Sequence, residues 1–453
     1  MSCPYAQFIF DNTKANHSQN GLTVVATENN NHDDRRKKET LDYATYLRTD
    51  ILLTALKCHS HTDHLDANSP PIHDEHFFIL IHQVFELWFK QILFELDSIR
   101  EIFIDSNHVM TSMFNINLRL KRLVKIFHVL VDQFELLETM TPIEFLEFRT
   151  YLSSGSGFQS LQFRIIEIKL GLTDSFRNIY KTKYFTDTMF KDEQSIELKN
   201  ALNEESLLIR IERWLEHIYD SMSFNFLSVF TSSVESLIEH EKKQKLTNGI
   251  DIETIERDAE TAKRKFASMI DPIEYETLLK NNERRISHKA MLSALMISLY
   301  HQQTCFQQSY QMLHLLMDVD AQMINWRHQH ILLVQRQIGR KPGTGGTDGI
   351  FYLQQTITNK YQVFIDLFNV STYLIPQRFL PTFTDKLIEP TRSLSSFTVD
   401  YQREISILKY HQSSVKQDET EEISIKYEQI IYLIIFIIGC IFAILSSLFK
   451  LFN

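Results

Sequence analysis

Long stretches of this chain repeat apolar residues at intervals of three and four positions, which is the spacing of one face of an α-helix. The clearest stretch follows Pro70 and Pro71, which block a helix upstream. It places on one face Phe78, His82, Phe85, Phe89, Ile92 and Leu96. Asp74 and Glu75 suit the positive end of such a helix. The pattern predicts a helix whose apolar face carries one titratable residue, His82.

A second stretch of this kind lies late in the chain. It places on one face Met312, Leu316, Val319, Met323, Trp326, His330 and Leu333. Gly339 follows it where a helix C-cap is expected. A lone histidine on such a stripe is most often a core residue held by one hydrogen bond. Two histidines on separate helices can also converge in an interior as iron or zinc ligands, so spacing leaves both roles open for His82 and His330.

Further helical patterns predict an all-α helical bundle. The expected divisions are a disordered polar arm at 1–40, a folded domain at 41–390 with a more charged helical excursion at 175–285, a polar linker at 391–426 and a hydrophobic tail at 427–450. Within the folded domain, helices are expected near 115–139, after Thr141-Pro142, from Phe158 to Leu170, in two runs from Ser287 to Ile338, and from Phe351 to Leu367.

The tail changes this picture, because residues 429–449 contain no charge and lie between Lys426 and Lys450. As a helix they extend about 32 Å, enough to cross the hydrocarbon core of a bilayer. We expect a single C-terminal transmembrane helix that anchors a cytoplasmic catalytic domain to an intracellular membrane. The alternative is a buried or oligomer-forming helix.

Composition supports the helical prediction and excludes several classes of protein. Glycine (11) and proline (9) are scarce, and phenylalanine (33) is abundant. A net charge of −10 makes a nucleic-acid partner unexpected. The four cysteines are scattered, which argues against a disulfide scaffold or a cysteine zinc site. No basic segment followed by an apolar run begins the chain, so we expect no secretory signal peptide.

Two loops carry residues that suggest chemistry. Segment 57–71 and its edge contain four histidines, a spacing that can bind metal, but no carboxylate or cysteine set accompanies them and a solvated loop is favoured. The glycines in 343–349 suggest a phosphate cradle beside Arg340 and Lys341. However, that loop follows a helix and lacks the GK[ST] ending, so its glycines more simply let the backbone approach another group closely.

The histidines on the two apolar stripes suggest a third kind of site. A large apolar cavity with one axial histidine would suit a haem.

Four long strings resemble tryptophan 2,3-dioxygenases. The strings are His73 to Arg100, Phe148 to Arg164 (FRTYL…SGFQSLQFR), Trp326 to Gly346 (WRHQH…GTGG) and Asp366 to Pro376 (DLFNVSTYLIP). They occur in the family's order over roughly 41–390. The match is specific because it rests on several long strings rather than on one short motif.

The resemblance implies an all-α haem enzyme, normally a homotetramer, with haem b (iron protoporphyrin IX) as cofactor. Its substrates would be L-tryptophan and O2. It would insert both oxygen atoms across the indole C2–C3 bond and form N-formyl-L-kynurenine, the first step of tryptophan catabolism by the kynurenine route.

The resemblance also implies roles for individual residues. His330 matches the proximal haem ligand, and His82 matches the distal histidine that accepts a hydrogen bond from the indole N–H. The positions that match residues contacting the substrate or the haem are Arg149 (substrate carboxylate), Thr344 (ammonium and carboxylate), Phe78 and Phe145 (indole ring), Ser156 and Gly157 (loop beside the haem), and Tyr43 and Tyr46 (pocket of a neighbouring subunit). A fixed guanidinium, an aromatic wall and one acceptor are what a zwitterionic indole amino acid requires.

Some positions depart from the family's pattern. Ser154-Gly155 stands where a Pro-Ala type of pair is expected, and Thr347-Asp348 adds a charge after the TGG sequence. The polar arm and the hydrophobic tail lie outside the pattern. Two other functions remain open, a haem-binding sensor without catalysis and a membrane-anchored scaffold with a degenerate enzyme domain. Retention of the three residues His82, Arg149 and Thr344 argues against the sensor, and retention of His330 argues against the scaffold.

Overall fold

The computed structural model describes residues 42–63, 66, 68–152, 159–172, 190, 192–339, 341 and 349–383. Every regular element in these ranges is helical, so the predicted all-α class is confirmed there. The α-helices are α2 (Tyr43–Leu47), α3 (Thr49–Thr54), α4 (His73–Ile102), α5 (Ser106–Thr111), α6 (Met113–Leu137), α7 (Pro142–Arg149), α8 (Leu161–Leu170), α10 (Asp192–Asn203), α11 (Leu207–Ser221), α12 (Phe226–Thr247), α13 (Ile252–Ile270), α14 (Pro272–Lys280), α15 (His288–Leu299), α16 (Thr304–Ile338), α17 (Gly349–Gln355) and α18 (Ile365–Asn369). Short 3-10 turns are η2 (Thr150–Leu152), η5 (Asn359–Tyr361), η6 (Val370–Tyr373) and η7 (Gln377–Phe379).

The chain divides into two compact units after Ala55. In the first unit, α2 and α3 are separated by Arg48, which adopts a left-handed conformation with φ of 53°. The Asp42 carboxylate caps α2 by accepting from the Thr45 N–H at 2.7 Å. Neither helix buries a residue.

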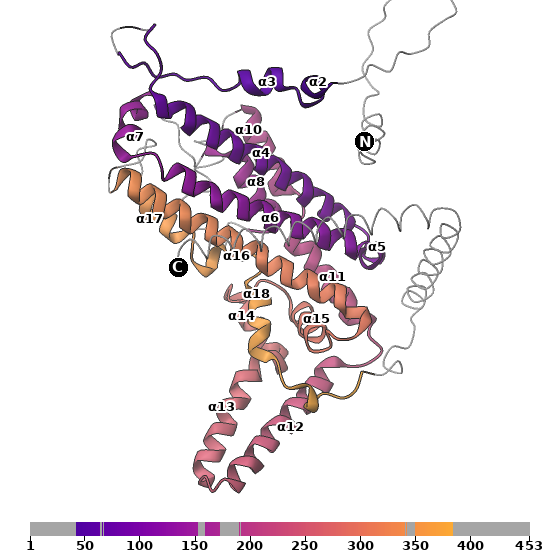
Figure 1. Cartoon of the computed structure of the whole chain (residues 1–453). Coiled ribbons are helices and arrows are strands. Elements are labelled where there is room, and N and C mark those ends of the chain that lie inside the picture. The colour runs from indigo at the N-terminus through magenta and orange to yellow at the C-terminus, as the bar shows by residue number, and fades with distance from the viewer. Residues whose placement is uncertain are drawn as a thin grey trace, which may run out of the picture. The chain divides into compact units, whose positions relative to one another are not determined.

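In the second unit, α4, α6 and α16 form the central layer of a bundle, with α8 packed on α4 (Figure 1). Helices α6 and α16 run parallel, since Asn117 of α6 donates to the Gln308 carbonyl near the start of α16, and Arg336 donates to Glu138 near the other end. The apolar stripes predicted on α4 and α16 point into this bundle. Phe85, Phe89 and Ile92 are buried on α4.

A buried ionic cluster fixes α16 against α8. Glu167 of α8 is 1% exposed and accepts from Arg164 at 2.8 Å and from Arg327 of α16 at 2.7 Å. The Arg327 guanidinium also lies over the Tyr361 ring, 5.4 Å from its centroid. A buried charge without a partner is strongly destabilising. The three side chains are therefore mutually dependent, and together they set the position of α16 along α8.

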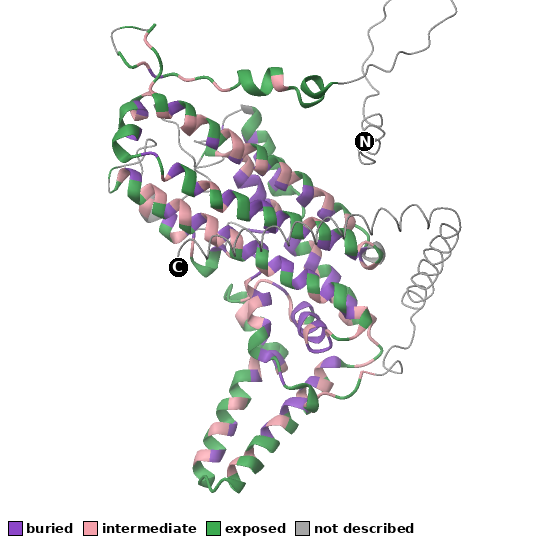
Figure 2. Cartoon of the chain, in the orientation of Figure 1, coloured by how far each residue is buried: buried purple, intermediate pink, exposed green. Residues whose placement is uncertain are grey.

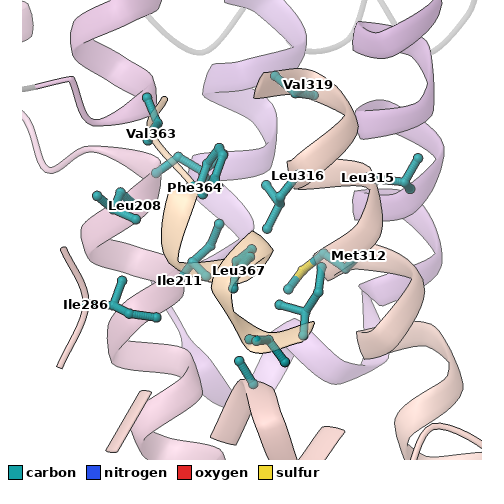
Figure 3. Packing of buried hydrophobic residues seen from close by; sticks show 14 of the residues in the cluster. Leu208, Ile211, Ile286, Met312, Leu315, Leu316, Val319, Val363, Phe364 and Leu367 are labelled. Atoms are coloured by element: carbon teal, nitrogen blue, oxygen red, sulfur yellow. The ribbon is translucent and has the colours of Figure 1, made fainter. Parts of the chain in front are cut away.

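A second part of the core lies where α11, α15, α16 and the segment from Val363 to Leu367 meet (Figure 3). Its labelled members are Leu208, Ile211, Ile286, Met312, Leu315, Leu316, Val319, Val363, Phe364 and Leu367. Asp320 of α16 accepts from the Val363 N–H at 3.0 Å, which holds this segment to the helix. The helix expected from Phe351 to Leu367 is in fact α17, a 3-10 turn and α18 in succession.

Within the charged subregion expected at 175–285, α11 packs against α15 and α4 and buries Trp214. Helices α12 and α13 pair with each other and project from the bundle, with mostly exposed residues toward their tip (Figure 2). Of the region 175–285, the part that projects from the bundle is therefore the α12–α13 hairpin. The residues of the candidate site lie on α4, α6, α7, α8 and α16.

The tail expected to cross a membrane lies outside the described residues, as do the arm and the linker. Among the described residues, α4 alone is long and apolar enough to span a membrane. It packs against α6, α7, α8 and α11, as the core helix of a bundle does. Membrane anchoring by 427–450 stays a prediction that fractionation of the tagged full-length chain tests, since recovery wholly in the soluble fraction contradicts it.

Candidate functional site

His82 lies in the third turn of α4 and forms one defined hydrogen bond. Its Nδ1 lies 2.7 Å from the Phe78 carbonyl oxygen, four residues back on the same helix. A carbonyl only accepts, so Nδ1 carries the proton and Nε2 is left as an acceptor. Desolvation by burial lowers the pKa of His82, and this keeps the ring neutral at neutral pH. The ring is therefore a fixed hydrogen-bond acceptor.

The surroundings of His82 combine solvent access with dense protein. The side chain is exposed by its accessible surface, although enough protein surrounds it to lower its pKa by desolvation. The ring is therefore open to solvent on one side and surrounded by protein on the others. Phe78 covers one side of the ring, with ring centroids 4.1 Å apart, and Phe85 lies on another side at 6.5 Å. His82 is thus placed to meet a ligand rather than buried in a filled core.

His330 lies near the C-terminal end of α16 among aromatic rings. The Trp326 centroid is 5.4 Å away, and the Phe134 ring of α6 is stacked at 6.1 Å. Burial, together with the nearby charges of His82 and Arg164, lowers the pKa of His330 to about 4. The imidazole is neutral at physiological pH, and no hydrogen bond engages its nitrogens within the described ranges.

One aromatic cluster joins the surroundings of the two histidines. Phe85, which contacts His82, lies 6.2 Å from Trp326 and 5.5 Å from Phe134, the two rings that flank His330. The two histidines are close enough for the charge of His82 to lower the pKa of His330. The structure therefore brings together the two histidines that the sequence places on separate apolar stripes.

Helix α7 brings a third group to this region. Thr141 caps it in a capping box with Glu144, and Pro142 occupies the first turn, as predicted. Its buried face carries Phe145 and Phe148, whose rings lie 5.8 and 5.4 Å from Phe78. Arg149, which follows directly, is half-buried. The guanidinium thus belongs to the helix that packs against the His82 face of α4.

The end of α16 also supports α7. Gln337 donates from Nε2 to the Met140 carbonyl at 2.7 Å, and Ile338 packs against the cluster of Met140, Phe145 and Phe148. The same helix therefore carries His330 and buttresses the segment that leads to Arg149. This arrangement ties the positions of the two groups together.

The possible ligand residues in this region fit a haem better than a free metal ion. In the part of the chain that the structure describes, no group of three or more histidine, cysteine or acidic residues could hold a metal ion. A haem requires only one axial ligand from the protein, and neutral His330 can supply it. The buried Trp326 Nε1 finds no hydrogen-bond partner within the described ranges. An acceptor on a cofactor beside His330 would satisfy that donor.

Several predicted residues are not tested by the structure. Ser156, Gly157 and Thr344 lie outside the described residues. Tyr43 and Tyr46 lie on α2 of the first unit, where they are 79% and 53% exposed. Their predicted contribution to a neighbouring subunit stays a prediction. The metal reading of the histidine-rich 57–71 loop gains no support in its described part.

Sequence reasoning missed the groups around the two histidines. In the sequence, Trp326 belongs to an apolar stripe and Phe134 to the helix expected near 115–139, and neither pattern marks them as neighbours of His330. Arg164 and Arg327 were not singled out, although Arg164 and Glu167 have the i, i+3 spacing of a helical ion pair. That spacing was a detectable signal for one pair. The cross-helix partner Arg327 had none.

Comparison with known proteins identifies the family to which the chain belongs. The family model described as tryptophan 2,3-dioxygenase matches residues 27–374. The chain is 40% identical to tryptophan 2,3-dioxygenase A of Danio rerio over 84% of this chain and 92% of the relative. It is 41% identical to tryptophan 2,3-dioxygenase of Mus musculus over 80% of this chain and 90% of the relative. A match of this extent and identity shows that the chain belongs to the tryptophan 2,3-dioxygenase family.

Proposed function

We propose that this protein is a haem-dependent dioxygenase that cleaves the indole C2–C3 bond of L-tryptophan with O2 and forms N-formyl-L-kynurenine. The observation that carries the proposal is the pairing of two neutral histidines across one aromatic cluster, with Arg149 on the adjoining helix. Family membership and about 40% identity to named tryptophan 2,3-dioxygenases support it.

In this proposal His330 would hold the iron of haem b, and Ser156 and Gly157 would contact the haem. The haem iron, when bound, supplies the binding and activation of O2. The protein contributes a neutral imidazole on α16, which the aromatic rings of Trp326 and Phe134 flank.

The substrate is held by groups of complementary chemistry. Arg149 pairs with the tryptophan carboxylate, and Thr344 contacts the ammonium and the carboxylate. Phe78 and Phe145 pack against the indole ring. His82 accepts the indole N–H at Nε2, because Nδ1 already donates to Phe78. Tyr43 and Tyr46 would complete the pocket of a neighbouring subunit.

One assay separates this function from its alternatives. The chain is purified without residues 391–453, its haem spectrum is recorded, and the absorbance of N-formylkynurenine is followed with tryptophan and a reductant. Haem with product supports the dioxygenase. Haem without product supports a haem-binding sensor, and the absence of haem supports a scaffold; either result contradicts the proposal.

The protonation of His82 predicts a pH dependence. Its pKa is lowered by burial from 6.5, so Nε2 remains an acceptor at and above pH 6.5 and becomes a donor only as the pH falls further. We expect kcat/KM for tryptophan to be constant from pH 7 to pH 8 and to decline on the acidic side of pH 6.5. Steady-state rates between pH 5 and 8 measure this. A midpoint above 6.5, or an unchanged acidic decline in His82→Ala, would contradict it.

We also propose that the chain forms a homotetramer. A stripe of large apolar side chains at seven-residue spacing lies exposed on α4, with Leu80 at 40%, Leu87 at 50% and Phe94 at 68% exposure. Seven residues are close to two helical turns, so the three share one face. Exposed apolar lines of this kind mark protein contacts.

The stripe gives a direct prediction. Leu87→Glu combined with Phe94→Glu should shift the particle to a smaller assembly, because two charges would enter the contact. Light scattering after size exclusion measures the mass. Leu246→Glu, at an exposed leucine on the projecting α12, serves as the control and should keep the wild-type mass. An unchanged mass in the double variant would place the contact elsewhere.

A further inference from the structure

The first turn of α4 contains a buried carboxylate that the proposed reaction does not use. Glu75 is 1% exposed. Its Oε2 accepts from the Ser60 hydroxyl at 2.6 Å and from the Ser60 N–H at 2.8 Å, and the His59 N–H lies 2.9 and 3.0 Å from its two oxygens. All these donors belong to one loop. A buried carboxylate held in this way fixes the loop that satisfies it.

The hydrogen bonds to Glu75 outweigh the effect of burial on its pKa. Desolvation acts to raise the pKa of Glu75, but the Ser60 hydroxyl and the amides of Ser60 and His59 hold it below its usual value. Glu75 is therefore ionised at neutral pH, and its charge is stabilised by the loop. The loop in turn depends on that charge for its conformation.

Ser60 connects the same network to the start of α4. Its hydroxyl donates to Glu75 and accepts from the Ile72 N–H at 3.0 Å. Ile72 is the N-cap of α4 and makes no side-chain cap of its own. Ser60 is 2% exposed, so these contacts are shielded from water. The loop and the helix start form one hydrogen-bonded unit.

The loop then reaches the turn that follows Arg149. The Tyr151 hydroxyl donates to the His61 carbonyl at 3.4 Å, and the His61 and Tyr151 rings meet edge to face at 6.4 Å. Tyr151 lies in η2, which begins directly after Arg149. The loop held by Glu75 is therefore in contact with the turn that directly follows Arg149.

Glu75 also shares a face of α4 with two residues of the proposed substrate pocket. Phe78 follows it by three positions and His82 by seven, so all three lie on one side of the helix. Ile72, Phe78 and Tyr151 pack together against the cluster around Phe145 and Phe148. Glu75 thus shares the His82 face of α4 and, through the loop that it binds, is linked to the turn after Arg149.

We propose that Glu75 is a positioning residue of the tryptophan site, which holds the loop at 59–61 and, through Tyr151, orients Arg149 toward the substrate carboxylate. This inference rests on the proposed function. Glu75 touches neither the substrate nor the haem in this arrangement. Glu75 therefore affects binding of the substrate carboxylate indirectly, by way of the orientation of Arg149.

The test is Glu75→Gln in the full-length, haem-loaded protein. The amide keeps the size of the side chain but replaces one acceptor oxygen by a donor that faces the loop amides. We expect KM for L-tryptophan to rise about ten-fold, with a smaller change in kcat, because displaced positioning groups weaken a contact without removing it. The Soret spectrum should remain that of the wild type.

A second ligand separates orientation of Arg149 from general damage. Tryptamine has the indole and ammonium of tryptophan but no carboxylate. Its affinity, measured by the shift of the haem spectrum, should stay within about two-fold of wild type in Glu75→Gln. In an Arg149→Ala background, Glu75→Gln should cause no further rise in KM. Equal loss of tryptamine and tryptophan binding, or additive effects of the two substitutions, would overturn the proposal.

Two more variants control for a folding defect in Glu75→Gln. Glu212→Gln changes another carboxylate that accepts a backbone N–H, from Ser287 at 2.7 Å, on α11; it should leave KM unchanged. Ser60→Ala removes one of the bonds to Glu75 and should raise KM in the same direction, which provides the test if Glu75→Gln does not fold. A wild-type KM in Ser60→Ala and Glu75→Gln, in a protein that makes product, refutes the inference alone. A wild-type protein that makes no product refutes the proposed function and the inference with it.

Discussion

Replacing His330 with alanine is expected to abolish haem retention while leaving the helices folded. In the proposed site His330, neutral and flanked by the rings of Trp326 and Phe134, is the residue that would hold the haem iron. Alanine is a good helix former, so α16 should persist around the substitution. The purified variant should lack the Soret band and should not recover it on incubation with haemin. Absorbance spectra and the ratio of haem to protein measure this, and circular dichroism measures the helix content.

His328→Ala provides the matched control for this experiment. His328 lies on the same helix two residues earlier and is exposed. Its loss should leave the haem content unchanged, because its side chain points away from the Trp326 and Phe134 cluster that flanks His330. A normal Soret band in His330→Ala would remove His330 from the site.

Replacing Arg149 with alanine should raise KM for L-tryptophan about 100-fold. Removing one partner of a partly buried charged pair costs about 3 kcal/mol, because the carboxylate then enters the pocket without its cation. The haem spectrum of the resting enzyme should be unaffected, since Arg149 belongs to α7 and His330 to α16. Steady-state kinetics with tryptophan and equilibrium titration of the haem spectrum measure the two effects.

Arg149→Lys divides the contribution of charge from that of geometry. Lysine keeps the positive charge but cannot form the two parallel hydrogen bonds of a guanidinium. Its KM should fall between those of the wild type and the alanine variant. An unchanged KM in Arg149→Ala would exclude Arg149 from substrate binding and would leave the amino-acid clamp to other residues.

The helices of the bundle were predictable where their apolar residues follow the helical period over several turns. The stripes through Phe85 and Met312 lie on α4 and α16, and the capping residues Thr141 and Gly339 mark the expected ends. Periodicity predicts these elements because the same residues that define the pattern are the ones buried in the bundle. His82 and His330 interrupt the stripes, but spacing alone could not distinguish a core histidine from a ligand.

The contacts between helices were not predictable from one sequence. Glu167 is bonded to Arg164 in its own helix and to Arg327 in another, and only the first pair has a local spacing. The proton position of His82 depends on the Phe78 carbonyl, which no side-chain pattern encodes. The break between α2 and α3 at Arg48 is a backbone conformation that arginine adopts rarely, and no side-chain pattern in the sequence signals it.

The parallel pairing of α6 and α16 has a consequence for how the protein is made. Their contacts join residues 191 to 198 positions apart in the chain. Because synthesis proceeds from the N-terminus, the distal half of the pocket emerges from the ribosome well before the ligand that is to hold the iron. Closure of so long a loop is slow compared with formation of the helices themselves. Haem should therefore bind late, after α16 has packed against α6. A nascent chain truncated before α16 should bind no haem and should show no Soret absorbance.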